Sequence, residues 1–316
     1  ISGLRGIANE SLDENVISNH VKAFSRLQPD GTILIGRDSR NHGCTFINSA
    51  CKALNHSNRN VVNCDLVPTP TIQFLVEKNN YAGGIVITAS HNPPEWNGIK
   101  FIDSTGLFLD DTQNKKLFNL ADSIKSKSQN IDNSKLSTTI INHNDPIEEH
   151  IAHTVNLSVI DSKSIINRKF KVVVDAVNGA ASYALPILLE KLGCKVITIN
   201  CKPDGSFPRG AEPLAHNLKQ LSESVLKNKA DVGFATDPDG DRLAVVDEKG
   251  VPIGEEYTLT ICTDGLLAKN KIRTPIITNL STTMALDEVS KKYNNYVERS
   301  LVGEINVVKK MKEKGS

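Results

Sequence analysis

Residues 87 to 100 read Ile-Thr-Ala-Ser-His-Asn-Pro-Pro-Glu-Trp-Asn-Gly-Ile-Lys, and they end a short apolar strand over 84–87. Pro93 and Pro94 lack the N–H group that a β-ladder needs, so the strand cannot continue through them. The sequence therefore predicts that Ser90 lies on a turn, with a histidine beside it and Lys100 ten residues further on. A serine in this position is suited to carry a phosphoryl group. An ordinary polar, proline-rich loop is the alternative.

A second loop carries three carboxylates. Residues 236 to 242 read Thr-Asp-Pro-Asp-Gly-Asp-Arg, so Asp237, Asp239 and Asp241 alternate with a proline and a glycine. Mg²⁺ prefers oxygen ligands and is typically held by a few carboxylates together with a phosphate oxygen. Three acids this close repel one another unless a cation lies between them. The sequence therefore predicts a Mg²⁺ site in this loop.

The acidic loop has two alternative interpretations besides a Mg²⁺ site. An EF-hand would explain the acidic spacing, but it needs glycine at its sixth position, where this chain has Arg242, and Pro238 occupies its second. The flanking segments 232–235 and 243–246 also have the composition of strands, whereas helices flank an EF-hand. A solvated acidic turn is the remaining alternative.

Together the two loops resemble those of the α-D-phosphohexomutase superfamily. The stretch 88–93 is similar to the family's phosphoserine loop, and 237–242 is similar to its metal-binding loop. Further similar segments lie at 1–6, 36–40, 65–70, 175–179 and 212–218, so the resemblance extends over the whole chain. It implies an isomerase that interconverts a hexose or hexosamine 6-phosphate and 1-phosphate through a phosphoserine enzyme and a bisphosphorylated sugar.

The resemblance also implies which residues perform the chemistry. The catalytic residues would be Ser90, Lys100 and Arg5. Lys100 would act as the acid and base, for which its pKa would need to be lowered by nearby cations. Mg²⁺ would be bound by Ser90, as its phosphate, and by Asp237, Asp239 and Asp241. A glucose 1,6-bisphosphate-type activator would prime the enzyme, and the segment 36–40 would brace the active-site loops or cap a helix.

The implied substrate- and phosphate-binding residues are His91, Arg242, Gly303 and Glu304. Bacterial phosphomannomutase/phosphoglucomutase members tend to have Gly-His where this chain has Gly303-Glu304. An acid at this position looks more like the phosphoglucosamine mutase branch, where a carboxylate could pair with the 2-ammonium of the substrate or merely replace a hydroxyl-binding histidine. The resemblance therefore favours glucosamine phosphate as the substrate, with phosphomannomutase/phosphoglucomutase activity as the alternative.

Strand–turn–helix–strand units begin near residues 32, 171 and 274 and predict an α/β protein with mixed or parallel sheets. The resemblance implies that these units form tandem repeated mixed-sheet domains of the phosphohexomutase type. We expect domain I over 1–145 with the phosphoserine loop, domain II over 146–254 with the metal-binding loop, and part of domain III over 255–316. The polar stretch 126–145 predicts a solvated connection or a loose edge. The family's fourth domain is expected to be absent, so the sequence would be C-terminally incomplete.

Composition gives no sign of a nucleic-acid or membrane partner, and the resemblance implies a small-molecule one. The chain has 37 Lys and Arg against 36 Asp and Glu, which argues against a nucleic-acid surface. No apolar run approaches the roughly 18 residues of a membrane helix. The six cysteines lack metal-binding spacing and predict free thiols in a reducing, cytoplasmic location. We expect a monomer or homodimer that binds a sugar phosphate. A phosphatase, or a non-catalytic sugar-phosphate- or metal-binding fragment, is the competing class.

Overall fold

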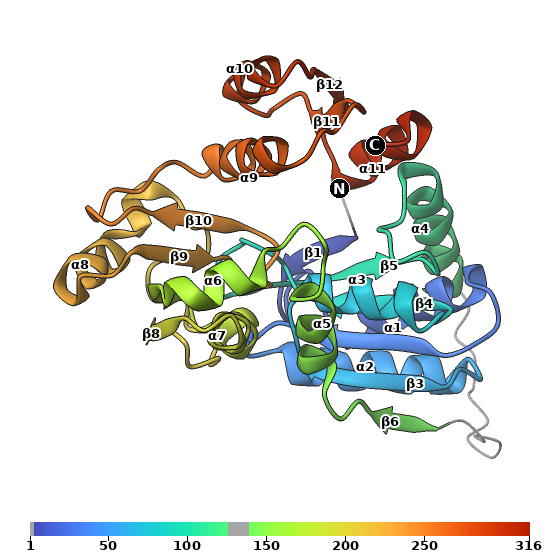
Figure 1. Ribbon diagram of the computed structural model, residues 1–316. Helices are drawn as coiled ribbons and strands as arrows, with labels where there is room; N and C mark the ends of the chain where they lie inside the picture. Colours follow the sequence, from blue (N-terminus) through green and yellow to red (C-terminus); the bar gives the residue numbers. More distant parts are fainter. Residues whose placement is uncertain (1–2, 126–138) are drawn as a thin grey trace.

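The computed structural model describes residues 3–125 and 139–316, which form three sheets with their helices (Figure 1). The largest sheet has the strand order β1-β5-β4-β2-β3-β6. Its strands are β1 (Leu4–Ile7), β2 (Ile33–Arg37), β3 (Val61–Leu66), β4 (Gly83–Ile87), β5 (Trp96–Ile102) and β6 (Ile140–Asn142). Strand β5 runs antiparallel to both β1 and β4, whereas β2 is parallel to β3 and β4. This sheet is therefore mixed.

Helices cover both faces of the first sheet. Helices α1 (Glu14–Leu27), α2 (Gly43–His56) and α4 (Asp111–Lys125) pack on one face, where Phe24, Phe46 and Leu117 surround Ile35. Helix α3 (Thr69–Lys78) packs on the other face against Leu34. Neighbouring residues of β2 thus serve opposite cores, as the two-residue period of a strand requires. Helix α5 (Pro146–Thr154) lies against α3 and also contacts the second unit.

The second unit repeats this layered arrangement around the strand order β10-β9-β7-β8. Its strands are β7 (Lys171–Asp175), β8 (Lys195–Ile199), β9 (Val232–Thr236) and β10 (Leu243–Val246). Helix α8 (Lys219–Asn228) covers one face, and α7 (Ala181–Lys191) covers the other. Helix α6 (Ser162–Arg168) and the short 3₁₀ helix η1 (Ala215–Asn217) complete the unit. Because β9 and β10 are antiparallel, the acidic loop is the connection of a hairpin.

The third unit contains the parallel strands β11 (Ile276–Asn279) and β12 (Val297–Ser300). Its helices are α9 (Tyr257–Lys269), α10 (Ala285–Lys292) and α11 (Glu304–Lys314). Figure 1 shows α11 next to α4 of the first unit, and Lys309 Nζ lies 2.6 Å from Asp110 Oδ2 there. Residues 199 positions apart in the sequence therefore meet across the first and third units.

The predicted α/β class with tandem mixed-sheet domains is confirmed. Of the predicted polar connection over 126–145, residues 126–138 lie outside the described part. Residues 140–142 form β6, an exposed edge strand that pairs with β3. Of the two expected possibilities, a solvated connection or a loose edge, these residues therefore form an edge. Across 3–125 and 139–316, no helix has both the length and the apolar character needed to cross a bilayer.

A pair of core and surface substitutions in the first unit tests this packing. Ile35 is 0% exposed, whereas Leu27 is 41% exposed. We expect Ile35→Ala to lower the free energy of unfolding by about 3 kcal/mol, because it removes buried methyl groups and leaves a cavity. Leu27→Ala should change it by less than about 0.5 kcal/mol. Urea unfolding followed by fluorescence of Trp96, the single tryptophan, measures both, and equal shifts would contradict the assignment of the core.

Candidate active site

Ser90 lies in the loop between the antiparallel strands β4 and β5, as the sequence predicted. It is 3% exposed and has a φ of 52°, in the left-handed region that non-glycine residues rarely adopt. Its N–H donates to Thr88 Oγ1 at 2.9 Å, and its carbonyl oxygen accepts from Arg40 Nη2 at 2.6 Å. A backbone conformation of this kind persists only where the surroundings fix it, and here both peptide groups of Ser90 are bonded.

Arg40 holds this loop from beneath. Its side chain is completely buried and donates five hydrogen bonds, which is the full capacity of a guanidinium group. The acceptors are the carbonyl oxygens of Ser90, Asn92, Pro93 and Trp96, at 2.5 to 2.9 Å, and the carboxylate of Asp38, at 2.9 Å. One side chain from the end of β2 therefore determines the path of the loop.

Asp38 links Arg40 to Thr88, the two residues that hold the backbone of Ser90. Its Oδ2 accepts from Arg40 Nε and also from Thr88 Oγ1, at 2.6 Å, and Thr88 in turn accepts from the N–H of Ser90. Burial raises the pKa of Asp38, although Arg40 and Thr88 oppose this effect. The prediction that segment 36–40 braces the active-site loops is confirmed by these bonds. The specific partners were not predicted, and no helix is capped by them.

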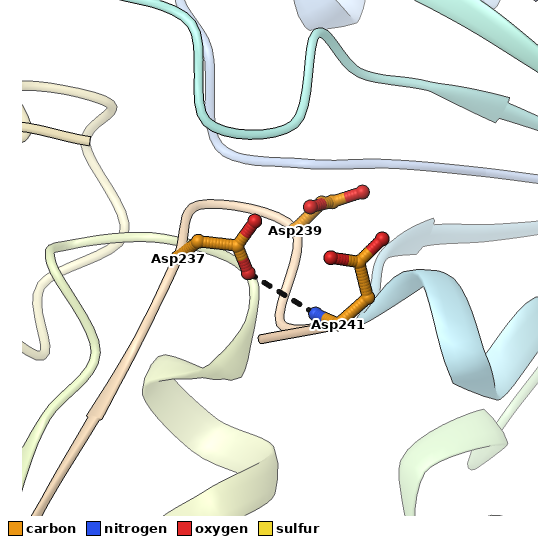
Figure 2. A group of neighbouring side chains, drawn as sticks. All are labelled: Asp237, Asp239 and Asp241. Carbon is orange, nitrogen blue, oxygen red and sulfur yellow. Dashed lines mark hydrogen bonds between the residues drawn. The ribbon is translucent and has the colours of Figure 1, made fainter. Parts of the chain in front are cut away.

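The predicted metal loop brings its three aspartates together, and Figure 2 shows them on one tight turn. One oxygen from each of Asp237, Asp239 and Asp241 lies within 4.8 Å of the others. Asp237 Oδ1 accepts from the backbone N–H groups of Asp241 and Arg242, both at 3.1 Å, and thereby closes the turn. Asp237 and Asp239 are completely buried, whereas Asp241 is exposed.

The charges on this turn are only partly balanced. Burial, together with Asp239 and Asp241, raises the pKa of Asp237 well above its usual value. Burial opposes ionisation of Asp239 as well, but the positive charge of Lys100, together with hydrogen bonds from Lys100 and Thr69, lowers its pKa to about 2. Asp239 Oδ1 is buried and has no hydrogen-bond partner in the described part of the chain. These three carboxylates and the unpaired oxygen fit a hard divalent cation such as Mg²⁺.

The two loops meet at the junction of the first and second units. Ser90 Oγ lies 3.4 Å from Asp237 Oδ2 and 3.4 Å from His91 Nδ1. Thr69 fastens the metal loop to α3, because its N–H donates to the Asp239 carbonyl at 2.8 Å and its hydroxyl to the Asp239 carboxylate at 2.6 Å. Nothing in the sequence around Thr69 indicated this contact.

Lys100 reaches the same carboxylates from β5. Its Nζ lies 2.7 Å from Asp239 Oδ2 and 2.8 Å from Asp241 Oδ2. The expectation of a lowered pKa is wrong for this arrangement. Burial does lower the pKa of Lys100, but the two carboxylates outweigh burial and raise it above the usual value. The expectation assumed that cations would surround Lys100, whereas the charged groups that contact it are the carboxylates of Asp239 and Asp241.

The structure also brings Arg5 to the phosphoserine loop. In the β1–β5 register Arg5 lies opposite Gly98, and its Nη1 donates to Asn92 Oδ1 at 2.8 Å. A Cβ at Gly98 would come within 2.6 Å of the Leu4 and Thr88 carbonyl oxygens, so only glycine permits this close approach. Arg5 Nε is buried without a partner among the described residues. A donor remains available there for an anion.

His91 and Arg242 lie at the edge of the same site. Burial, together with Arg242 and Arg5, lowers the pKa of His91, so its imidazole is neutral at neutral pH. The Arg242 side chain is 43% exposed, and its Nη1 lies 2.5 Å from Glu212 Oε1. It therefore has a carboxylate partner that the sequence did not reveal.

Glu304 is the first residue of α11, after Gly303, and it approaches the site from the third unit. Its Oε1 accepts from Gln73 Nε2 of α3 at 2.9 Å. Burial raises the pKa of Glu304, and the charge of Asp241 adds to this effect, whereas the hydrogen bond from Gln73 and the charge of Lys100 oppose it. Eight of the ten sequence-predicted site residues therefore lie in the two loops or on the strands beside them, and Glu304, which follows Gly303, contacts α3 from the third unit. Thr69 and Gln73 were missed, and Asp38 was expected only as part of the bracing segment 36–40.

The chain matches successive domains of one family. The matching descriptions are phosphoglucomutase/phosphomannomutase, alpha/beta/alpha domain I over residues 1–128, domain II over 148–250 and domain III over 254–316. This protein belongs to the phosphoglucomutase/phosphomannomutase family. It is therefore a phosphohexomutase, which is an isomerase of a Mg²⁺-dependent family.

Relatives of this phosphohexomutase carry more than one substrate name. A protein of Methanopyrus kandleri named "Probable phosphoglucosamine mutase" is 32% identical over 99% of this chain and 68% of its own length. A phosphoglucomutase/phosphomannomutase of Thermococcus kodakarensis is 35% identical over 98% of this chain and 68% of its own length. A family structure from Burkholderia thailandensis has a TM-score of 0.83, covers 100% of this chain and 68% of its own, and at 24% identity supports the fold alone.

Replacing Arg40 by lysine tests whether it orders the loop. Lysine presents a compact point charge and cannot make the planar set of five bonds. We expect Arg40→Lys to lower mutase kcat by more than about tenfold, since a small displacement of a reacting group is costly. The matched control is Arg59→Lys. Arg59 is also buried and donates to the Ser25, Gln28 and Pro29 carbonyls, but away from the site. Similar losses of kcat in both variants would show a general effect of instability.

Replacing Asp241 by asparagine tests the metal loop. Of the three aspartates it is the exposed one, so its loss should disturb folding least. Mg²⁺ should raise the melting temperature of the unchanged protein, because it binds the folded state only. In Asp241→Asn we expect this rise to fall and the Mg²⁺ affinity measured by calorimetry to drop by at least about tenfold. Asp122→Asn, on the exposed side of α4, is the control, and equal affinities in both variants would exclude Asp241 as a ligand.

Proposed function

We propose that this protein interconverts glucosamine 6-phosphate and glucosamine 1-phosphate through a phosphoserine at Ser90. The observation that carries the proposal is the approach of Ser90 Oγ to Asp237 Oδ2, at 3.4 Å, from a different domain. A serine hydroxyl beside a three-carboxylate turn suits transfer of a phosphoryl group, for which positioning and charge stabilisation provide most of the catalysis.

In the proposed reaction the 1- or 6-hydroxyl of the sugar attacks the phosphorus on Ser90. The bond from phosphorus to Ser90 Oγ breaks, the bond to the sugar oxygen forms, and the sugar becomes bisphosphorylated. After the sugar turns over, the other phosphoryl group returns to Ser90 by the reverse step. Mg²⁺ held by Asp237, Asp239 and Asp241 would neutralise charge on the phosphoryl group.

Lys100 handles the proton of the attacking hydroxyl in this proposal. In the structure Asp239 and Asp241 keep it in the ammonium form, so it can accept the hydroxyl proton only after it has given up one of its own protons. His91 is neutral and 3.4 Å from Ser90 Oγ, which suits a hydrogen bond to the phosphoserine. Arg5 is the catalytic cation next to the loop, with its unpartnered Nε as the donor.

Substrate binding is proposed for Arg242, Gly303 and Glu304. Arg242 carries the planar donor set that suits phosphate, and Glu304 supplies a carboxylate for the 2-ammonium group. The name of the Methanopyrus relative supports the amino sugar. Phosphomannomutase/phosphoglucomutase activity is the second candidate, because the Thermococcus relative at 35% identity carries that name. The carboxylate of Glu304 favours the amino sugar over these hexoses.

The proposal extends to the cellular setting of the reaction. A glucose 1,6-bisphosphate-type activator would supply the first phosphoryl group to Ser90. We propose a cytoplasmic monomer or homodimer, with domain I ending at residue 145 and domain II at 254. The near-neutral balance of 37 cationic and 36 acidic residues supports a small-molecule substrate over a nucleic acid.

Ser90→Ala tests the phosphoenzyme. After incubation of the full-length protein with glucose 1,6-bisphosphate and Mg²⁺, intact mass should show one added phosphoryl group, which Ser90→Ala should lack. Ser104→Ala, at an exposed turn after β5, is the control and should keep it. Absence of the group from the unchanged protein under all conditions would refute the mechanism.

Coupled assays with the same samples rank the substrates. We expect kcat/KM to be highest for glucosamine 6-phosphate and lower for the glucose and mannose phosphates, because only the amino sugar offers an ammonium to Glu304. Ser90→Ala should lower kcat by more than about a thousandfold with every substrate, since it removes the group that carries the phosphoryl. A preference for glucose or mannose phosphate would establish the second candidate instead.

A further inference from the structure

Helix α11 brings the third unit against the first through side-chain contacts at successive turns. At its first residue, Glu304 Oε1 accepts from Gln73 Nε2 at 2.9 Å. Further along, Lys309 Nζ lies 2.6 Å from Asp110 Oδ2. The two contacts differ in their surroundings, because Lys100 and Asp241 act electrostatically on Glu304, whereas Lys309 and Asp110 form an exposed pair next to α4.

Gln73 is itself held in place. Its Nε2 lies 3.4 Å from the Gly106 carbonyl oxygen in addition to Glu304. Gly106 has a φ of 79°, and a Cβ there would come within 2.7 Å of the Gln73 carbonyl oxygen. The turn therefore packs directly on the backbone of α3. An amide has two N–H donors, so one can face the Gly106 carbonyl while the other orients the Glu304 carboxylate.

The partner of Glu304 is neutral, and this decides what the carboxylate can bind. A lysine or arginine at position 73 would compensate its charge, whereas an amide fixes its direction and leaves the charge available. Glu304 Oε2 has no hydrogen-bond partner within residues 3–125 and 139–316. The result is an oriented carboxylate that forms no ion pair within residues 3–125 and 139–316, and such a group binds an ammonium more strongly than it binds a neutral hydroxyl.

We propose that Gln73 is a positioning residue that determines amino-sugar specificity, by holding Glu304 so that its free oxygen faces the 2-ammonium group of the substrate. This inference rests on the proposed function, and it assigns a role to a residue of domain I that touches no phosphate. A hydroxyl at the same carbon of the sugar gains less from the held carboxylate. Loss of the amide should therefore reduce discrimination more than it reduces turnover.

The test is the ratio of kcat/KM for glucosamine 6-phosphate to that for glucose 6-phosphate, measured with the full-length protein. We expect Gln73→Leu to lower kcat/KM about tenfold for the amino sugar, mainly through KM, and less than about threefold for glucose 6-phosphate. The matched control is Lys309→Ala, which removes the other contact between the same units. It should leave the ratio unchanged.

The outcomes separate the two proposals. Equal losses with both sugars in Gln73→Leu, or a ratio that falls equally in Lys309→Ala, would show that Gln73 merely docks the third unit and would overturn the inference. Intact mass on the same samples reports the phosphoryl group on Ser90. A phosphorylated enzyme with an unchanged ratio refutes the role of Gln73 alone. A protein that never gains the phosphoryl group refutes the proposed function and the inference with it.

Discussion

The buried Asp38–Arg40 pair is the interaction on which the site depends. An isolated charge in a protein interior is strongly unfavourable, and a buried pair is stable only when its remaining donors and acceptors are satisfied. Arg40 meets this condition by bonding the carbonyl oxygens of the loop that carries Ser90. The unusual backbone of Ser90 and the burial of Arg40 thus explain each other, since neither would be stable without the other.

Charge compensation of buried groups also connects the first two domains. The metal loop gathers three carboxylates of domain II, and domain I supplies the ammonium of Lys100 and the hydroxyl of Thr69 that offset part of this charge. Ser39 Oγ adds a further link by donating to the Asn178 carbonyl at 2.7 Å. Contacts that hold the domains together are therefore also contacts that set the charge of the site. A substitution at this junction would affect both properties.

The sequence predicted what depends on short stretches of backbone and missed what depends on distant partners. Prolines and glycines fix the local path of 87–100 and 236–242, so both loops and their side chains were found. The wrong direction for the Lys100 pKa has a clear cause. Its partners are 139 and 141 residues away, and no local pattern shows whether anions or cations surround a lysine after folding. The contact of Gln73 with Glu304 was not predicted for the same reason, because the two residues are 231 positions apart.

The position of Glu304 makes its proposed role in sugar recognition dependent on the arrangement of the domains. Its carboxylate reaches the first unit only because α11 lies against that unit. There Gln73 binds Glu304, and Asp110 binds Lys309. If the third unit moved away, the free oxygen of Glu304 would leave the site while Ser90, held by Arg40, would stay in place. The residue proposed to carry the phosphoryl group is thus fixed within one domain. The group proposed to distinguish sugars is delivered by another domain, so the proposed mechanism makes selection of an amino sugar, and not loading of Ser90, dependent on the contact between the first and third units.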